Sequence, residues 1–129
     1  MIARLWKVGF AMVVAGLLLQ SCVAPPQIPV SDGVTIQREL NDRTVIGYFV
    51  GGAGGSYCEY HTPNGTVLGR DTEIYAGNWM VRGNAVCYAF PGQPEDCQQV
   101  YVTGRSVTFY NAFGQTIARG NLADGNLCS

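Results

Sequence analysis

The chain has 129 residues, of which 47% are hydrophobic and 13% are charged, with eight basic and nine acidic side chains. This length suits one domain preceded by a leader segment. The basic residues are few and scattered, so no positive patch is available to neutralise phosphates, and nucleic acid is excluded as an expected partner.

Residues 1–21 have the pattern of a signal peptide. Arg4 and Lys7 precede an uncharged, largely apolar stretch from position 8 to position 19, which is the order of regions that export signals use. A permanent membrane helix needs about 20 apolar residues to cross the hydrocarbon core. We therefore expect residues 1–21 to direct export and to be removed, and a retained membrane helix is the alternative.

The segment from Leu19 to Cys22 resembles the lipobox of bacterial lipoproteins, with an aliphatic residue, Gln20, the small Ser21 and then the cysteine. The resemblance implies that the thiol of Cys22 takes a diacylglyceryl group and that its freed amine is acylated. Two or three acyl chains on one residue give a stable anchor, whereas one chain anchors only marginally. An ordinary cleaved signal peptide, with Cys22 unmodified, is the alternative.

Residues 22–30 follow as a tether, because Pro25, Pro26 and Pro29 favour extended structure. Val23, rather than an aspartate, follows the cysteine, and the sorting rule of enteric bacteria then predicts an outer-membrane lipoprotein facing the periplasm. The remaining residues, 31–129, are expected to form a single β-rich domain. Its membrane partner would be reached through the lipid, and an envelope protein or a cell-wall component is the other expected partner.

A short helix is predicted between Ser31 and Asp42, where capping residues precede Ile36 and Leu40, four positions apart. The β-branched run from Val34 to Ile36 makes a strand the alternative. We expect such a helix to plug one end of the domain.

Beyond Arg43 the sequence predicts seven or eight antiparallel strands, because short β-branched and aromatic runs alternate with glycine-containing turns. The predicted turns are Pro63-Asn64-Gly65, Arg82-Gly83-Asn84, Thr103-Gly104-Arg105 and Phe113-Gly114-Gln115. Val107 and Phe109 would share one strand face and Thr108 and Tyr110 the other. The predicted fold is an all-β meander that curls into a small barrel or half-barrel with one short N-terminal helix.

Four cysteines remain besides Cys22, an even number that in a small exported domain indicates two disulfides. Three pairings are open. We favour Cys87 with Cys97, which closes a short loop, and Cys58 with Cys128, which ties the C-terminus to an early strand.

Two resemblances bear on the domain. Gly77, Trp79, Val81, Gly83, Cys87, Tyr88 and Cys97, together with the segment from Leu40 to Gly47, resemble a group of small exported proteobacterial proteins with no assigned activity, which supports the fold and the first disulfide. The order Tyr75, Gly77, Trp79, Gly83, Ala85 is similar to that of the membrane-bound inhibitors of c-type lysozyme, which implies a periplasmic lysozyme inhibitor with an inhibitory loop around Tyr75, Trp79 and Arg82. The spacing differs, and Arg82 stands where those inhibitors carry a lysine.

Candidate chemistry is sparse, and the main prediction is a non-enzymatic binding or structural role with no cofactor, no metal and no catalytic residues. Glu59 and His61 would share a strand face, so a small envelope hydrolase with His61 as general base is an alternative, although an exposed histidine on a hairpin is expected instead. Asp71 with Glu73 and Glu95 with Asp96 are the paired carboxylates. An aromatic set either lines a concave face for a glycan or apolar ligand or fills the core: Tyr75, Trp79, Tyr88, Tyr101, Phe109 and Tyr110.

Overall fold

The computed structural model describes residues 27–52 and 54–129. The predicted signal peptide and Cys22 lie outside these residues, as does the tether up to position 26. Within the described part of the chain, no helix is both long enough and apolar enough to cross a bilayer.

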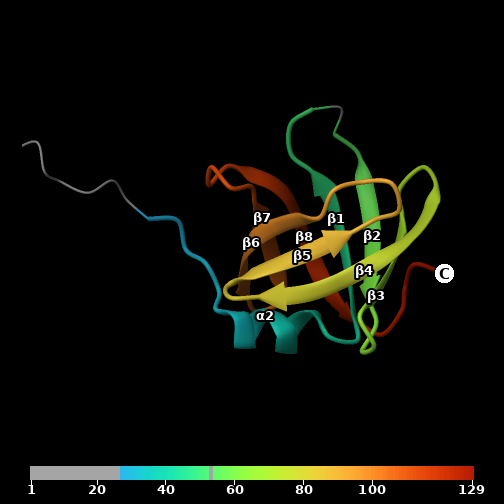
Figure 1. Ribbon diagram of the computed structural model, residues 1–129, viewed down its shortest axis with the longest axis horizontal. Helices are drawn as coiled ribbons and strands as arrows, with labels where there is room; N and C mark the ends of the chain where they lie inside the picture. Colours follow the sequence, from blue (N-terminus) through green and yellow to red (C-terminus); the bar gives the residue numbers. More distant parts are fainter. Residues whose placement is uncertain (1–26, 53) are drawn as a thin grey trace, which may run out of the picture.

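Eight antiparallel strands form one closed barrel in which each strand pairs with the next along the chain and β8 pairs with β1 (Figure 1). The all-β meander is therefore confirmed, as a closed barrel. The strands are β1 (Arg43–Phe49), β2 (Ser56–His61), β3 (Thr66–Arg70), β4 (Ile74–Arg82), β5 (Ala85–Ala89), β6 (Asp96–Thr103), β7 (Ser106–Tyr110) and β8 (Thr116–Asp124).

The closing pair, β1 with β8, is the one pairing that joins the two ends of the meander. Val45 lies opposite Leu122, and Gly47 lies opposite Gly120. A side-chain carbon added at Gly47 would lie 2.1 Å from the carbonyl oxygen of Arg119. Glycine at this position therefore lets the two strands approach closely enough to close the sheet.

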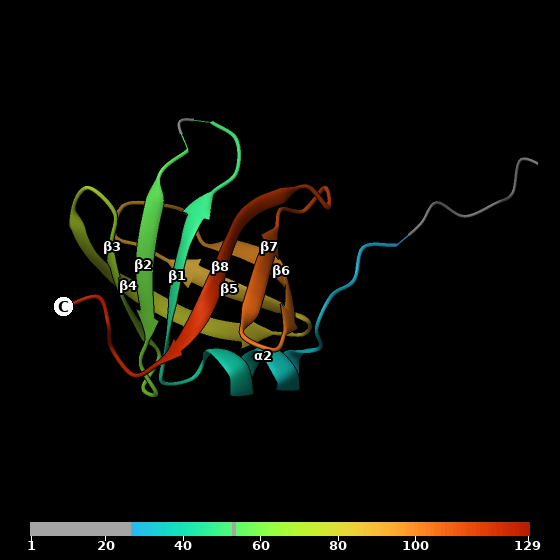
Figure 2. The same cartoon turned by 180° about the vertical axis from the view of Figure 1, so that it is seen from behind.

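The helix α2 (Gly33–Leu40) lies across one end of the barrel, as Figures 1 and 2 show. Asp32 caps it by accepting a hydrogen bond from the backbone N–H of Thr35 at 2.8 Å. Ile36 and Leu40 are fully buried and belong to the barrel core. The predicted helix is confirmed, and the strand alternative for Val34–Ile36 is wrong, because the cap and the four-residue apolar spacing outweigh the β-branched side chains.

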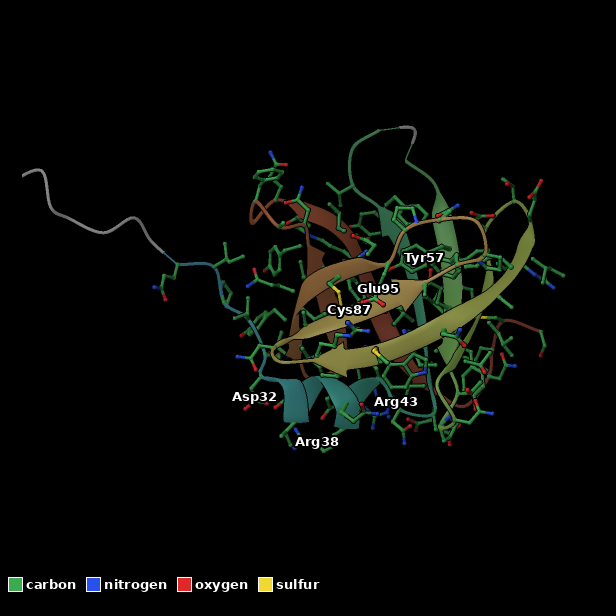
Figure 3. All side chains as sticks on the ribbon, viewed as in Figure 1. Asp32, Arg38, Arg43, Tyr57, Cys87 and Glu95 are labelled. Atoms are coloured by element: carbon green, nitrogen blue, oxygen red, sulfur yellow. A yellow bond between two sulfur atoms is a disulfide. The ribbon has the colours of Figure 1, made fainter. Side chains whose placement is uncertain are left out.

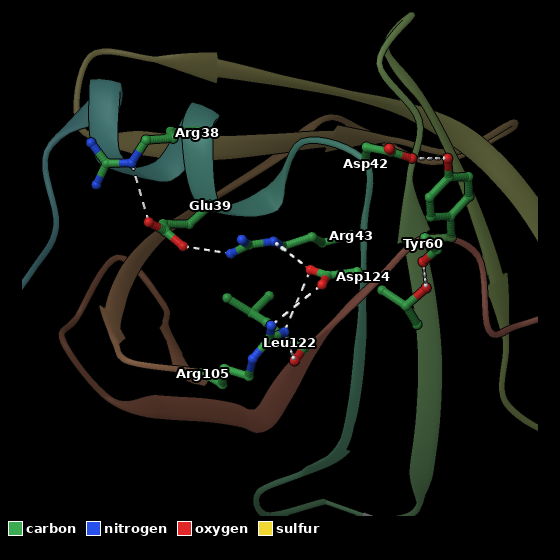
Figure 4. Close-up of polar contacts among 10 residues, drawn as sticks. Arg38, Glu39, Asp42, Arg43, Tyr60, Arg105, Leu122 and Asp124 are labelled. Carbon is green, nitrogen blue, oxygen red and sulfur yellow. Dashed lines mark hydrogen bonds and ion pairs between the residues drawn. The ribbon is translucent and has the colours of Figure 1, made fainter.

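A chain of ion pairs joins α2 to the strands at the same end of the barrel (Figure 4). Glu39 pairs with Arg43 at 2.6 Å, Arg43 with Asp124 at 3.2 Å, and Asp124 with Arg105 at 3.3 Å. Exposed pairs stabilise a fold only slightly. The buried Ile36 and Leu40 therefore hold the helix in place, and the ion pairs contribute little to its stability.

Both predicted disulfides are present, Cys87 with Cys97 and Cys58 with Cys128. Cys87 and Cys97 lie opposite each other on β5 and β6. Cys128 lies in the segment after β8, which crosses the outer surface of β1: Thr44 Oγ1 donates to the carbonyl of Gly125 at 2.6 Å, and the N–H of Leu127 donates to Thr44 Oγ1 at 3.0 Å. Thr44 is fully buried as a result, although its side chain points away from the barrel interior.

Because consecutive strands are antiparallel, alternate connections lie at opposite ends of the barrel. The turns at 62–65, 83–84 and 104–105 lie at the end covered by α2, where the N–H of Gly33 donates to Asn84 Oδ1 at 3.0 Å. The other connections, whose described residues are 50–52 with 54–55, 71–73, 90–95 and 111–115, lie at the opposite end. The end without the helix is the open end of the barrel.

Candidate functional site

A cavity of about 520 Å³ enters the barrel from the open end. Volumes of this size hold a small organic ligand, and eight-stranded barrels have an interior just wide enough to be filled by side chains or to hold one such molecule. The cavity reaches down to Tyr88, Phe109 and Ala118. Below these residues the barrel is filled by the apolar core and closed by α2.

Aromatic rings form much of the cavity wall, and Tyr57 is labelled among them in Figure 3. Phe49 stacks on Tyr57 with ring centroids 4.6 Å apart, and Phe90 meets the edge of Tyr75 at 5.5 Å. The full aromatic lining is Phe49, Tyr57, Tyr75, Tyr88, Phe90 and Phe109. Three of the six aromatic residues predicted to line a concave face do line the cavity: Tyr75, Tyr88 and Phe109.

The polar lining of the cavity carries a single sign of charge. Its ionisable groups other than tyrosine are carboxyls, Glu59 inside the barrel and Asp71, Glu73 and Asp96 nearer the mouth, and none of the described lining residues is lysine or arginine. A cavity with low-dielectric walls and one sign of charge attracts ions of the opposite sign.

Glu59 on β2 is a carboxyl group that points into the barrel, and it accepts a hydrogen bond from a tyrosine. Tyr75 Oη donates a hydrogen bond to Glu59 Oε1 at 2.7 Å. Burial raises the pKa of Glu59, the hydrogen bond from Tyr75 works against that rise, and the negative charge of Asp71 adds to it. Burial and the charge of Glu59 in turn raise the pKa of Tyr57, Tyr75 and Tyr88, so all three phenols stay protonated at neutral pH and can donate hydrogen bonds.

Gly69 on β3 makes the Glu59–Tyr75 contact geometrically possible. It lies between Glu59 and Tyr75 in the sheet, opposite both. A side-chain carbon added there would lie 2.2 Å from the Tyr75 ring. The ring therefore lies flat over a position without a side chain, and this directs its hydroxyl to Glu59.

His61 was expected to be exposed on a hairpin, and that expectation is wrong: the side chain is fully buried inside the barrel. Its Nε2 is 2.8 Å from Tyr88 Oη, while Nδ1 has no hydrogen-bond partner among the described residues. Burial lowers the pKa of His61 to about 4. Which of the two groups donates depends on the histidine tautomer, because a neutral imidazole has one N–H donor and one acceptor nitrogen.

The Glu59–His61 pair predicted for a hydrolase is not assembled. The two side chains do share the inward face of β2, as predicted, but no hydrogen bond joins them, and His61 does not line the cavity. His61 instead packs against Trp79 and supports Tyr88 from below.

The three predicted binding residues lie apart. Tyr75 lines the cavity. Trp79 is buried in the core, where its Nε1 donates to the carbonyl of Thr62 at 3.0 Å. Arg82 is exposed near the α2 end and pairs with Glu95 at 3.2 Å. The structure therefore supports Tyr75 alone as a cavity residue.

Among the described residues, one group of cysteine and carboxyl side chains is close enough to suggest a metal site: Cys87, Glu95 and Cys97. Figure 3 labels Cys87 and Glu95. Both sulfurs are joined in a disulfide and cannot act as thiolate ligands, so this group does not form a metal centre.

The sequence indicates Glu59 only as a partner for His61, and it does not connect Glu59 with Tyr57, Tyr75 and Tyr88. The available signal was the alternation of β2, which places Tyr57, Glu59 and His61 on one face. No family model, no curated protein and no solved structure matches this chain, so the case for a function rests on the cavity itself.

Proposed function

We propose that this protein is a lipid-anchored envelope lipoprotein that binds a small molecule, without chemical conversion, in the open end of its barrel. The observation that carries the proposal is the cavity of about 520 Å³, with aromatic walls and one partly buried carboxyl. A barrel interior that served stability alone would be filled, since protein cores pack to the density of organic crystals.

The proposed anchor would lie near the open end. Ile28 Cδ1 lies 3.5 Å from the side-chain position at Gly114, in the β7–β8 turn at that end, so the described part of the chain begins beside the open end. Cys22 is six positions earlier, a span of at most about 20 Å. Ile74 and Phe113, which are 78% and 88% exposed, also lie at the open end. A lipid on Cys22 would therefore hold the cavity mouth close to the membrane surface.

Binding is tested with 2-naphthylmethanol, a neutral aromatic probe, titrated calorimetrically into the protein in nanodiscs, with empty nanodiscs as the reference. We expect one probe molecule per chain, and loss of that binding in Ala118→Phe, because the new ring occupies the floor of the cavity. Ala112→Phe, at an exposed position outside the cavity, is the matched control and should bind normally. Equal binding by both variants, each showing a wild-type unfolding transition, would contradict the proposal.

The anchor is tested separately with Cys22→Ser, which removes the sulfur that would carry lipid. We expect this variant to lose incorporation of labelled fatty acid and to leave the membrane fraction, while the barrel keeps both disulfides. Ser21→Gly keeps a small residue before the cysteine and should remain lipidated. Lipid labelling that persists in Cys22→Ser would refute the anchor.

Lysozyme inhibition, and binding to an envelope protein or wall component, stay predictions from the sequence. For the inhibitor, the separation of Tyr75 from Arg82 along β4 means that one surface loop does not present both residues.

A further inference from the structure

We propose that the ligand is an organic cation, an ammonium group attached to an apolar body, with the ammonium bound at Glu59 and the body held by the aromatic walls. This inference rests on the proposed function and specifies the chemical class of its ligand.

The first support is the missing counter-charge of Glu59. Its one hydrogen bond among the described residues comes from Tyr75, and no salt bridge in residues 27–52 and 54–129 includes it. A carboxyl held in a partly buried site without a positive partner costs free energy. A bound ammonium would supply the charge that the protein itself does not.

The second support is the set of rings around that carboxyl. Tyr57, Tyr75 and Tyr88, from β2, β4 and β5, line the same cavity as Glu59, and Tyr75 donates a hydrogen bond to it. Faces of aromatic rings attract cations, and such rings around an anion are the surroundings in which quaternary ammonium groups bind. An anionic ligand would meet repulsion from Glu59 and would find no positive group in the lining.

The third support is the negative charge of the side chains at the mouth of the cavity. Asp71, Glu73 and Asp96 line the entrance and, like Glu59, are negative when ionised. They would raise the local concentration of a cation and lower that of an anion. The wall below them is largely apolar, which favours a ligand whose remaining surface is aromatic or aliphatic.

The test compares three probes with the same ring system, (2-naphthylmethyl)trimethylammonium, 2-naphthylmethanol and 2-naphthylacetate, on the protein in nanodiscs. We expect the cation to bind about tenfold more tightly than the alcohol and the acetate to bind least. Glu59→Gln keeps the size of the side chain and an acceptor for Tyr75. It should reduce the affinity for the cation about tenfold and leave the affinity for the alcohol unchanged.

Glu95→Gln, which removes a carboxyl outside the cavity, is the matched control and should leave all three affinities unchanged. Thermal unfolding of Glu59→Gln at or above the wild-type temperature would establish that the variant is folded. Binding of the alcohol or the acetate as tight as that of the cation, or a cation affinity unaffected by Glu59→Gln, would overturn the cation assignment while leaving a binding cavity. Failure of all three probes to bind would contradict the proposed function as well.

Discussion

Replacing Cys58 and Cys128 together by alanine should lower the free energy of unfolding by about 4 kcal/mol. The disulfide spans 70 positions, and in the loop-entropy model a bridge of that span stabilises mainly by restricting the unfolded chain. For a domain whose total stability is about 5–15 kcal/mol, this is a large share. The C-terminal segment should also detach, which would expose Thr44 to water.

The matched control is the double replacement of Cys87 and Cys97, whose bridge spans 10 positions. The same model gives it about 2.5 kcal/mol, and the two residues remain neighbours through the pairing of β5 with β6. Denaturant unfolding of both variants and the wild type, without reductant, measures the two losses. A larger loss for the Cys87–Cys97 pair would contradict the assignment of the C-terminal bridge as the main covalent brace.

Acidification from pH 6.5 to pH 4 should remove up to about 3 kcal/mol of stability through His61. Burial lowers the pKa of this side chain from 6.5 to about 4, and each unit corresponds to about 1.4 kcal/mol. Below pH 6.5 the unfolded chain takes up a proton at His61 that the folded chain does not, so the unfolded state is favoured as pH falls. Above pH 6.5 the histidine is neutral in both states and contributes no slope.

The measurement is the free energy of unfolding across pH 4 to 7.5, for the wild type and for His61→Gln, which keeps a donor for Tyr88. His61 is the only histidine of the chain, so the difference in slope between the two proteins isolates it. Glu59, whose pKa is raised by burial, acts in the opposite sense, because folding favours its protonated form, and it contributes equally to both curves. Equal slopes would show that His61 titrates freely and is not enclosed.

The strands and turns could be predicted because their signals are local. Glycine-containing turns separate the hairpins, and the four-residue spacing of Ile36 and Leu40 marks the helix. Local signals do not mark the beginning of β4, which starts at Ile74. Glycine is unfavourable inside a strand, so Gly77 suggests that a strand ends there. In the barrel Gly77 lies within β4, and the Phe90 ring occupies the space that a side chain at this position would need.

The candidate site could be predicted less well than the fold, because the residue types on β2 do not indicate which of its two faces points into the barrel. One face carries Tyr57, Glu59 and His61, and the other carries Cys58 and Tyr60, so hydrophobicity does not decide between them. The choice is made by distant parts of the chain, since Cys58 bonds to Cys128 outside the barrel and His61 meets Tyr88 inside it. Barrel closure through β1 and β8 is also non-local, and it creates the cavity.

The central claim, that the barrel interior is the binding site, is tested most directly by nuclear Overhauser contacts between a bound naphthyl probe and the aromatic rings of the protein. We expect contacts from the probe to Tyr57, Tyr75 and Tyr88, all inside the open end. Contacts confined to exposed side chains on the outer wall, such as Ile46 and Tyr48, would contradict it.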